Sequence, residues 1–257
     1  MDDLAPELVV TAHGPVRLIE LNRPGQRNAA SERLHTALAD VWARLATDGE
    51  VRAVVLTGRG RAFSAGGDFH VMTRVQVDEA FREQNLDEAR RIITGMVRCP
   101  APVVAAVNGP AVGLGCSLAL LSDLVLMAER AYLADPHVQV GLAAGDGGAL
   151  VLPLLVGPAR AKELLFLGER VSSQEAVRLG LANRVVPDEK LLDEAMDLAR
   201  RLAALPVTAL RGTKRAVNAH LEQAIGAIME TGLDAERRSM ISAEHAEIVA
   251  GLLASRS

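Results

Sequence analysis

The sequence predicts an α/β fold in which parallel strands alternate with helices, followed by a helical C-terminal region. Short apolar runs alternate with stretches of helical periodicity, two of these runs end in glycine-rich turns, and the chain beyond Pro187 is helical in pattern almost throughout. Alternating strands and helices are typical of parallel βαβ units. We expect an α/β core over residues 1–190 and a helical region that supports oligomerisation over residues 191–257.

Five apolar runs predict the strands of the sheet, because each is short and rich in Val, Leu or Ala. They are Leu8–Thr11, Val16–Leu21, Ala53–Thr57, Val103–Val107 and Leu124–Met127. Leucine and valine recur at helical spacing within Ser31–Ala46, and a polar helix is expected over Asp78–Val97, ending before Pro100.

The C-terminal part begins with a short capped helix. Ser172-Ser173-Gln174-Glu175 has the spacing of a capping box, and Gly180 is placed to end that helix. Two apolar stripes follow, one through Leu191, Ala195, Leu198 and Leu202 and another from Ile225 to Leu253. Packing within the chain explains such stripes.

Composition excludes several classes of protein. A chain of 257 residues with a net charge of −4 supports one sizeable core and is not typical of a nucleic-acid binder. The start, Met1 to Leu4, lacks the basic and apolar regions of a signal peptide, and no apolar run reaches the length of a membrane span. Cys99 and Cys116 lack metal-ligand spacing. We expect a cytoplasmic protein with reduced thiols and no metal.

The two glycine-rich turns carry most of the functional information. One is Phe63 to Asp68, and the other is Asn108 to Ser117; each follows a strand-like run and precedes a predicted helix. Small residues in such turns let backbone N–H groups approach a ligand. Two such turns together suggest two amides converging on one oxygen, which is an oxyanion hole.

These turns belong to a set of motifs through which the chain resembles the crotonase (enoyl-CoA hydratase/isomerase) superfamily. The motifs lie between about Val16 and Asn218: Leu21 to Pro24 with Arg27 to Ala29, Phe63 to Asp68, Pro102 to Gly109, Cys116 to Asp123, Gly141 to Gly148, and Thr213-Lys214. The resemblance implies a spiral of ββα units and C-terminal helices that cover the site and build trimers or hexamers. It leaves the reaction open, because one fold hosts many chemistries.

By position, the resemblance assigns the two oxyanion-hole N–H groups to Gly67 and Leu114. It places the adenine of coenzyme A beside Ala65 and Gly66, and a phosphate near Arg27. Three further residues, Asp68, His70 and Gly113, are expected to line the substrate site. Coenzyme A enters as part of an acyl-CoA substrate, and no covalently bound cofactor is expected.

The chain departs from the family at its two catalytic glutamates. Ser117 stands in place of the first and His137 in place of the second. Each general acid or base is worth roughly 10²–10⁴ in rate, so we expect little ordinary hydratase activity unless other groups take over. We interpret Ser117 as a small polar residue that widens the pocket.

His137 and Asp146 are the candidates to replace those glutamates. An imidazole titrates near neutral pH and a carboxylate beside it would orient it, as in a catalytic triad. A loop histidine is more often structural, and Asp146 has the alternative role of a helix N-cap. His70 is the next candidate, with a position on the helix surface or the coenzyme A side as its alternative.

Three functions remain open at this point. The first is an acyl-CoA enzyme that stabilises a thioester enolate, with hydration, dehydration or double-bond isomerisation as its reaction. The second is a C–C bond hydrolase of β-dicarbonyl compounds, since some superfamily hydrolases resemble this chain in a local His–Asp pair. The third is a coenzyme A-binding homologue without catalysis.

Overall fold

The computed structural model describes residues 4–255 and contains a six-stranded main sheet in the order β1-β2-β3-β4-β6-β9. The strands are β1 (Leu8–His13), β2 (Val16–Leu21), β3 (Ala53–Gly58), β4 (Val103–Val107), β6 (Leu124–Ala128) and β9 (Arg184–Val186). β1 and β2 form an antiparallel hairpin, and every later pairing in this sheet is parallel. All five predicted strands are confirmed, and β9 joins them at the edge.

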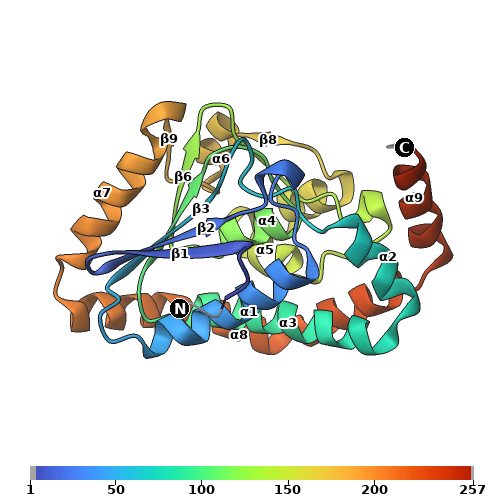
Figure 1. Cartoon of the computed structure of the whole chain (residues 1–257), viewed down its shortest axis with the longest axis horizontal. Coiled ribbons are helices and arrows are strands. Elements are labelled where there is room, and N and C mark those ends of the chain that lie inside the picture. Colours follow the sequence, from blue (N-terminus) through green and yellow to red (C-terminus); the bar gives the residue numbers. More distant parts are fainter. Residues whose placement is uncertain (1–3, 256–257) are drawn as a thin grey trace.

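Helices follow the strands and cover the sheet (Figure 1). They are α1 (Glu32–Thr47), α2 (Phe69–Val77), α3 (Glu79–Arg98), α4 (Leu114–Leu120), α5 (Gly148–Leu167), α6 (Ser173–Leu179), α7 (Leu191–Ala203), α8 (Val207–Met240) and α9 (Ala243–Ala254). The predicted N-cap and C-terminal glycine are confirmed: Ser172 Oγ accepts a hydrogen bond from the N–H of Glu175, and Gly180 ends α6 with φ of 78°, while the Glu175 carboxylate binds Arg178.

A second sheet of three very short strands lies beside the main one. It consists of β5 (Ala111–Val112), β7 (Tyr132–Ala134) and β8 (Val171–Ser172). Strands of two or three residues have no periodicity to detect, which is why the sequence did not predict them. This sheet matters for function, because β5 lies in the second glycine-rich turn and β7 leads directly to His137.

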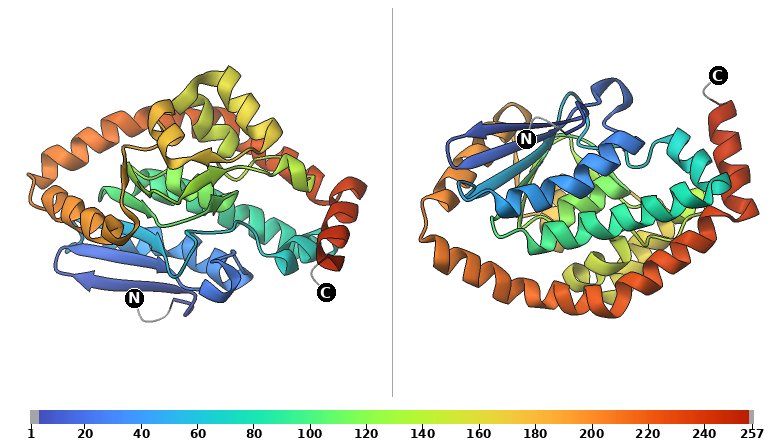
Figure 2. Two further views of the ribbon diagram at one scale, coloured as in Figure 1. Left: turned by 90° about the horizontal axis from the view of Figure 1, so that it is seen from above. Right: turned by 60° about the horizontal axis from the view of Figure 1, so that its bottom comes forward.

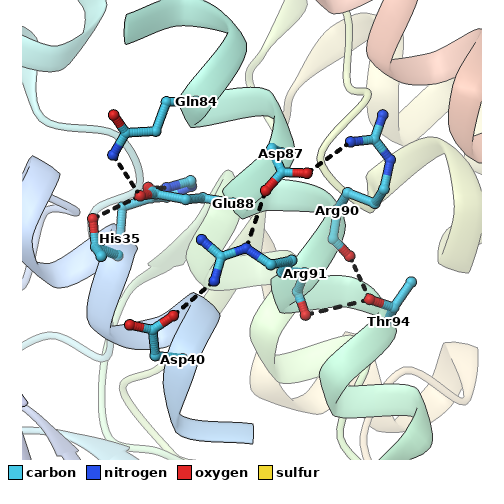
Figure 3. Close-up of polar contacts among 9 residues, drawn as sticks. His35, Asp40, Gln84, Asp87, Glu88, Arg90, Arg91 and Thr94 are labelled. Carbon is cyan, nitrogen blue, oxygen red and sulfur yellow. Dashed lines mark hydrogen bonds and ion pairs between the residues drawn. The ribbon is translucent and has the colours of Figure 1, made fainter. Parts of the chain in front are cut away.

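Helices α1 and α3 pack side by side through buried polar contacts (Figure 3). His35 Nδ1 lies 2.7 Å from Glu88 Oε2, and both side chains are almost fully buried. Thr36 donates to the other oxygen of Glu88 at 2.7 Å, and Arg91 forms an ion pair with Asp40 at 2.7 Å. The buried carboxylate of Glu88 is therefore hydrogen-bonded across this interface, while the Arg91–Asp40 pair lies on its exposed side.

The C-terminal helices differ in how they contact the core. Helix α7 packs directly on the sheet through Leu191, Ala195, Met196 and Ala199. Helix α8 has 34 residues and runs along α3 and α5 (Figure 2). The stripe expected from Ile225 to Leu253 is divided between two helices, because α8 ends at Met240 and Ser242 caps α9. Helix α9 then packs against α2.

The structure bears on the expectations about the chain ends and about membrane spans only within the described residues. The acidic residues 1–3, like residues 256–257 of the helical region, lie outside the described residues. Among residues 4–255, no helix combines the length and apolarity needed to cross a bilayer.

Candidate active site

The two glycine-rich turns lie side by side. The N–H groups of Phe63 and Ser64 both donate to the carbonyl of Pro110, and the N–H of Val112 donates to the carbonyl of Ser64 at 2.9 Å. At Gly66, φ is +86° and an added Cβ would lie 2.9 Å from the Val112 oxygen. Only glycine accommodates both this backbone conformation and this close approach, so Gly66 allows the turns to meet.

The N–H groups assigned to the oxyanion hole are left without protein acceptors. In the described chain, the N–H of Gly66 donates to Ser64 Oγ and that of Gly113 donates to the Ala134 carbonyl. Outside regular helices and strands, no hydrogen bond of residues 4–255 uses the N–H of Gly67. Leu114 is the first residue of α4, where an N–H has no partner within the helix. Neither N–H group is thus committed to a protein acceptor within the described residues, as the predicted oxyanion hole requires.

A cavity of about 760 Å³ opens beside these turns. Eight of the residues singled out from the sequence line it: Arg27, Ala65, Gly66, Gly67, Asp68, His70, Gly113 and His137. Leu114, Ser117 and Asp146 are not among its lining residues. Ser117 is 1% exposed, and its hydroxyl has no hydrogen-bond partner among residues 4–255. It faces Gly147, where an added Cβ would lie 3.0 Å from the Ser117 side chain.

The loop before α1 closes the cavity on the side of the first turn. The amide nitrogen of buried Asn28 donates to the Ala62 carbonyl at 2.9 Å, which ties the loop to the turn. Arg23 was not singled out from the sequence, although it lines the cavity and forms an ion pair with Asp68 at 2.8 Å. Asp68 also caps α2, accepting a hydrogen bond from the N–H of His70.

His137 lies where the cavity meets the second turn. It follows β7 and precedes a short 3₁₀ helix, η2 (Val138–Val140), and it is 9% exposed. A Cβ added at Gly113 would lie 3.4 Å from the His137 ring carbon Cε1. The imidazole therefore packs against the residue that precedes the proposed Leu114 donor.

Both ring nitrogens of His137 lie beside carboxylates. Nδ1 pairs with Oδ1 of Asp135, and Nε2 lies 3.4 Å from Oδ2 of Asp146. The sequence predicted Asp146 as the partner but missed Asp135, although Ala134-Asp135-Pro136-His137 places it only two residues away. Asp135 is the group that fixes the ring through Nδ1, while Asp146 holds a longer contact with Nε2.

These contacts determine the charge of the histidine. Burial lowers the pKa of His137, but the negative charges of Asp146 and Asp135 outweigh burial and raise the pKa well above its usual value. Burial raises the pKa of Asp146, but the charge of His137 more than compensates and lowers it. The resting pair is therefore an imidazolium and a carboxylate, buried together.

Asp146 does not cap the helix that follows it. Helix α5 begins at Gly148, its N-cap is Gly147, and no side chain makes a capping hydrogen bond there. The alternative interpretation of Asp146 as an N-cap is therefore wrong. Its Oδ2 faces His137, and its buried Oδ1 has no hydrogen-bond partner within the described residues.

A third acid, Glu236 of α8, reaches the same cluster and was missed from the sequence. One ligand atom each from His137, Asp146 and Glu236 lie within 4.8 Å of one another, a donor set that can hold a divalent cation. A cation needs deprotonated ligands. Here ion pairing keeps the proton on His137, and burial, with the charge of Asp146, raises the pKa of Glu236 to about 8. Without a bound cation, His137 and Glu236 therefore both carry protons at neutral pH.

Comparison with protein families places this geometry in a known context. A family model described as enoyl-CoA hydratase/isomerase matches residues 11–253. Among solved structures, an enoyl-CoA hydratase/isomerase from Mycobacterium paratuberculosis is similar with a TM-score of 0.95 and 49% identity, covering 97% of this chain and 99% of that one.

Relatives with assigned reactions differ in their chemistry. The 1,2-epoxyphenylacetyl-CoA isomerase of Escherichia coli is 34% identical over 247 residues, covering 94% of this chain and 93% of its own. The 2,3-dehydroadipyl-CoA hydratase of the same organism is 34% identical over 232 residues, with coverages of 90% and 88%. Similar identity to an isomerase and a hydratase leaves the reaction to be argued from the site.

Proposed function

This chain belongs to the enoyl-CoA hydratase/isomerase family, and we propose that it forms a thioester enolate and moves one proton with the His137–Asp146 pair. The observation that carries the proposal is the position of the His137 ring, at the cavity wall beside Gly113, where the two glycine-rich turns meet. The reaction that this arrangement favours is double-bond isomerisation in an acyl-CoA.

The thioester oxygen would accept hydrogen bonds from the N–H groups of Gly67 and Leu114. Negative charge develops on this oxygen as the enolate forms, and preformed donors stabilise that charge most strongly. Arg27, Ala65 and Gly66 lie along the same cavity, where they support binding of the coenzyme A part.

A proton that moves between His137 Nε2 and Asp146 lets the same imidazole act first as the base and then as the acid. With that proton on Asp146, Nε2 takes a proton from a carbon next to the acyl double bond, and the electron pair moves into the enolate. The imidazolium then returns a proton at another carbon, which shifts the double bond. Nδ1 stays bound to Asp135 throughout.

Isomerisation needs only one such group, because the proton removed at one carbon is returned at another. Hydration needs water to be held and activated while a second proton reaches the α-carbon. The two family positions that hold glutamates for this purpose carry Ser117 and His137 here, and Ser117 does not line the cavity. This absence of a second cavity-lining acid at these positions favours isomerisation.

A second candidate is hydrolysis of a C–C bond in a β-dicarbonyl compound. The contact between His137 and Asp146 supports it, since such a pair can activate water for addition to a ketone. In this case the same two N–H groups would stabilise the leaving enolate.

Solvent exchange tests the proposal independently of the acyl chain. In D₂O, we expect the enzyme to introduce deuterium next to the thioester of an acyl-CoA and to convert 3-enoyl-CoA to 2-enoyl-CoA, both read by mass spectrometry. His137→Ala should abolish both, whereas the control His220→Ala, on α8 and exposed, should not. Turnover of cyclic β-diketones without exchange into any acyl-CoA would establish the second candidate instead.

A further inference from the structure

We propose that Glu236 is a positioning residue of this site, which acts through Asp146 on the charge and proton affinity of His137. This inference rests on the proposed function of the His137–Asp146 pair. It concerns a residue of α8 that no motif identifies and that contributes nothing to the cavity wall among the described residues.

The contact between α8 and the loop that carries Asp146 is built for close approach. An added Cβ at Gly145 would lie 2.7 Å from Oε2 of Glu236, and one at Gly232 would lie 3.3 Å from the Cα of Gly145. The N–H of Ala143 donates to Ser239 Oγ at 3.0 Å, which fixes the same loop to α8. Two facing glycines thus bring the carboxyl group of Glu236 against the backbone next to Asp146.

Glu236 has the surroundings of a neutral carboxyl group. It is 5% exposed, and its Oε2 has no hydrogen-bond partner within residues 4–255. The neighbouring cation on α8, Arg237, is turned away and binds Glu83 of α3 at 2.7 Å. An ionised carboxylate in this position would be buried without a cation of its own.

The charged groups that face Glu236 come from the two segments packed against α8. Burial and the negative charge of Asp146 raise its pKa to about 8, with a smaller contribution in the same direction from Asp135, while His137 opposes them. At neutral pH Glu236 therefore keeps its proton. Asp146 can then remain ionised beside His137, because its neighbour Glu236 is neutral and does not repel its charge.

Ionisation of Glu236 would change the reacting pair. A second negative charge next to Asp146 holds the shared proton more tightly, so His137 gives it up less readily. The three groups then titrate together rather than one by one. We expect the activity of the wild type to fall as the pH passes the value at which Glu236 ionises.

Glu236→Gln tests this role, because glutamine has the same shape and cannot ionise. Its control is Glu230→Gln on the same helix, an exposed residue paired with Arg90. The first measurement is unfolding by urea between pH 5 and 8. The pKa of Glu236 is about 8 in the folded protein and 4.5 for an ordinary glutamate, so the folded state binds one more proton between these values. The folding equilibrium constant of the wild type should therefore fall about tenfold for each unit of rising pH, relative to Glu236→Gln.

The second measurement follows His137 itself, by NMR of its imidazole ring from pH 5 to 10. We expect a component near pH 8 in the wild type and in Glu230→Gln, and its loss in Glu236→Gln. The alkaline limb of kcat should change with it. Identical pH profiles of unfolding and of the His137 signal in wild type and Glu236→Gln would overturn the inference.

Failure of the proposed reaction and failure of the role of Glu236 give different results. Failure of acyl-CoA exchange in the wild type would remove the proposed reaction while leaving both the unfolding and the NMR differences. If exchange occurs but Glu236→Gln keeps the wild-type pH profile of kcat as well as its unfolding profile, the reaction stands and the role of Glu236 is wrong. Should Glu236→Gln fail to fold, Gly232→Ala tests the same contact, because its Cβ pushes α8 away from Gly145. It should weaken the component near pH 8 in the His137 signal, and an unchanged component would overturn the inference.

Discussion

At the scale of single residues, the charge on His137 decides what this site can do. A free imidazole is half protonated near pH 6.5, whereas here Asp135 and Asp146 raise the pKa of the ring well above that value. The histidine therefore differs from a glutamate, because at rest it is a cation paired with a carboxylate and must pass its proton to Asp146 before it can act as a base. That makes Asp146 part of the reacting group rather than a distant support.

Removing His137 or Asp146 should show that they act as a unit. We expect His137→Ala to lower kcat/KM by about 10²-fold or more, since a general acid–base is lost. Asp146→Asn should cost less, because the imidazole remains. The double variant should be little worse than His137→Ala alone, and steady-state kinetics on an acyl-CoA substrate measures this non-additivity. Full activity in His137→Ala would shift attention to His70.

Asp135 provides the pH test of the site. Its carboxylate favours the charged ring, so Asp135→Asn removes one of the charges that raise the pKa of His137. The alkaline limb of kcat/KM should therefore move to lower pH in Asp135→Asn. A limb that moves to higher pH, or does not move, would contradict the assignment. Asp188→Asn, on the half-buried first residue of η3 (Asp188–Lys190) and paired with Arg130 instead of His137, is the control.

At the scale of elements, the site depends on two strand-to-helix turns that meet. Each turn follows a parallel strand, and Phe63 and Ser64 pair with Pro110 to Val112 through backbone hydrogen bonds. Because the proposed donors are backbone N–H groups, a leucine at position 114 would serve as well as any other side chain. The turn conformation, not the side chain, is what must be kept.

Gly67 allows one N–H group to be removed with a matched control. Gly67→Pro removes the N–H, whereas Gly67→Ala keeps it and places its Cβ 3.0 Å from the flexible end of Met72. We expect Gly67→Pro to lose about 10²-fold or more in kcat and Gly67→Ala to lose much less. Circular dichroism should show both variants folded. Equal activity of the two would mean that this amide is not a donor.

At the scale of the whole molecule, several large apolar side chains are exposed on α5. Leu154 and Leu167 are each 50% exposed and Phe166 is 63% exposed. Large exposed apolar residues grouped on one element are typical of an interface between subunits. This agrees with the trimer or hexamer that the family resemblance implies, which remains a prediction.

Light scattering coupled to size-exclusion chromatography tests that prediction. We expect a mass of three or six chains for the wild type. Phe166→Asp should reduce the mass if α5 lies in the interface, because it buries an unpaired charge there. Val217→Asp on α8, another exposed apolar position, is the control. A monomeric wild type would refute the predicted assembly.

Much of this fold was accessible from local patterns. The five strand runs, the capped helix at Ser172 and the helix starting at Asp68 depend on neighbours within a few residues, and each is found as predicted. The three-stranded second sheet was not, because its strands are too short to show a period. The same limit explains why Asp135 was overlooked, although it stands next to a residue already singled out.

The sequence by itself determined the family, the two turns and the presence of a histidine at a position where the family resemblance implies a glutamate. These features reside in local residue order, which backbone conformation and motif spacing translate directly into structure. Only the tertiary structure decided the charge of that histidine, because a pKa depends on distance and burial. It joined His137 to Asp135 and Asp146, and it brought Glu236 from α8 to their side through the contact between Gly145 and Gly232.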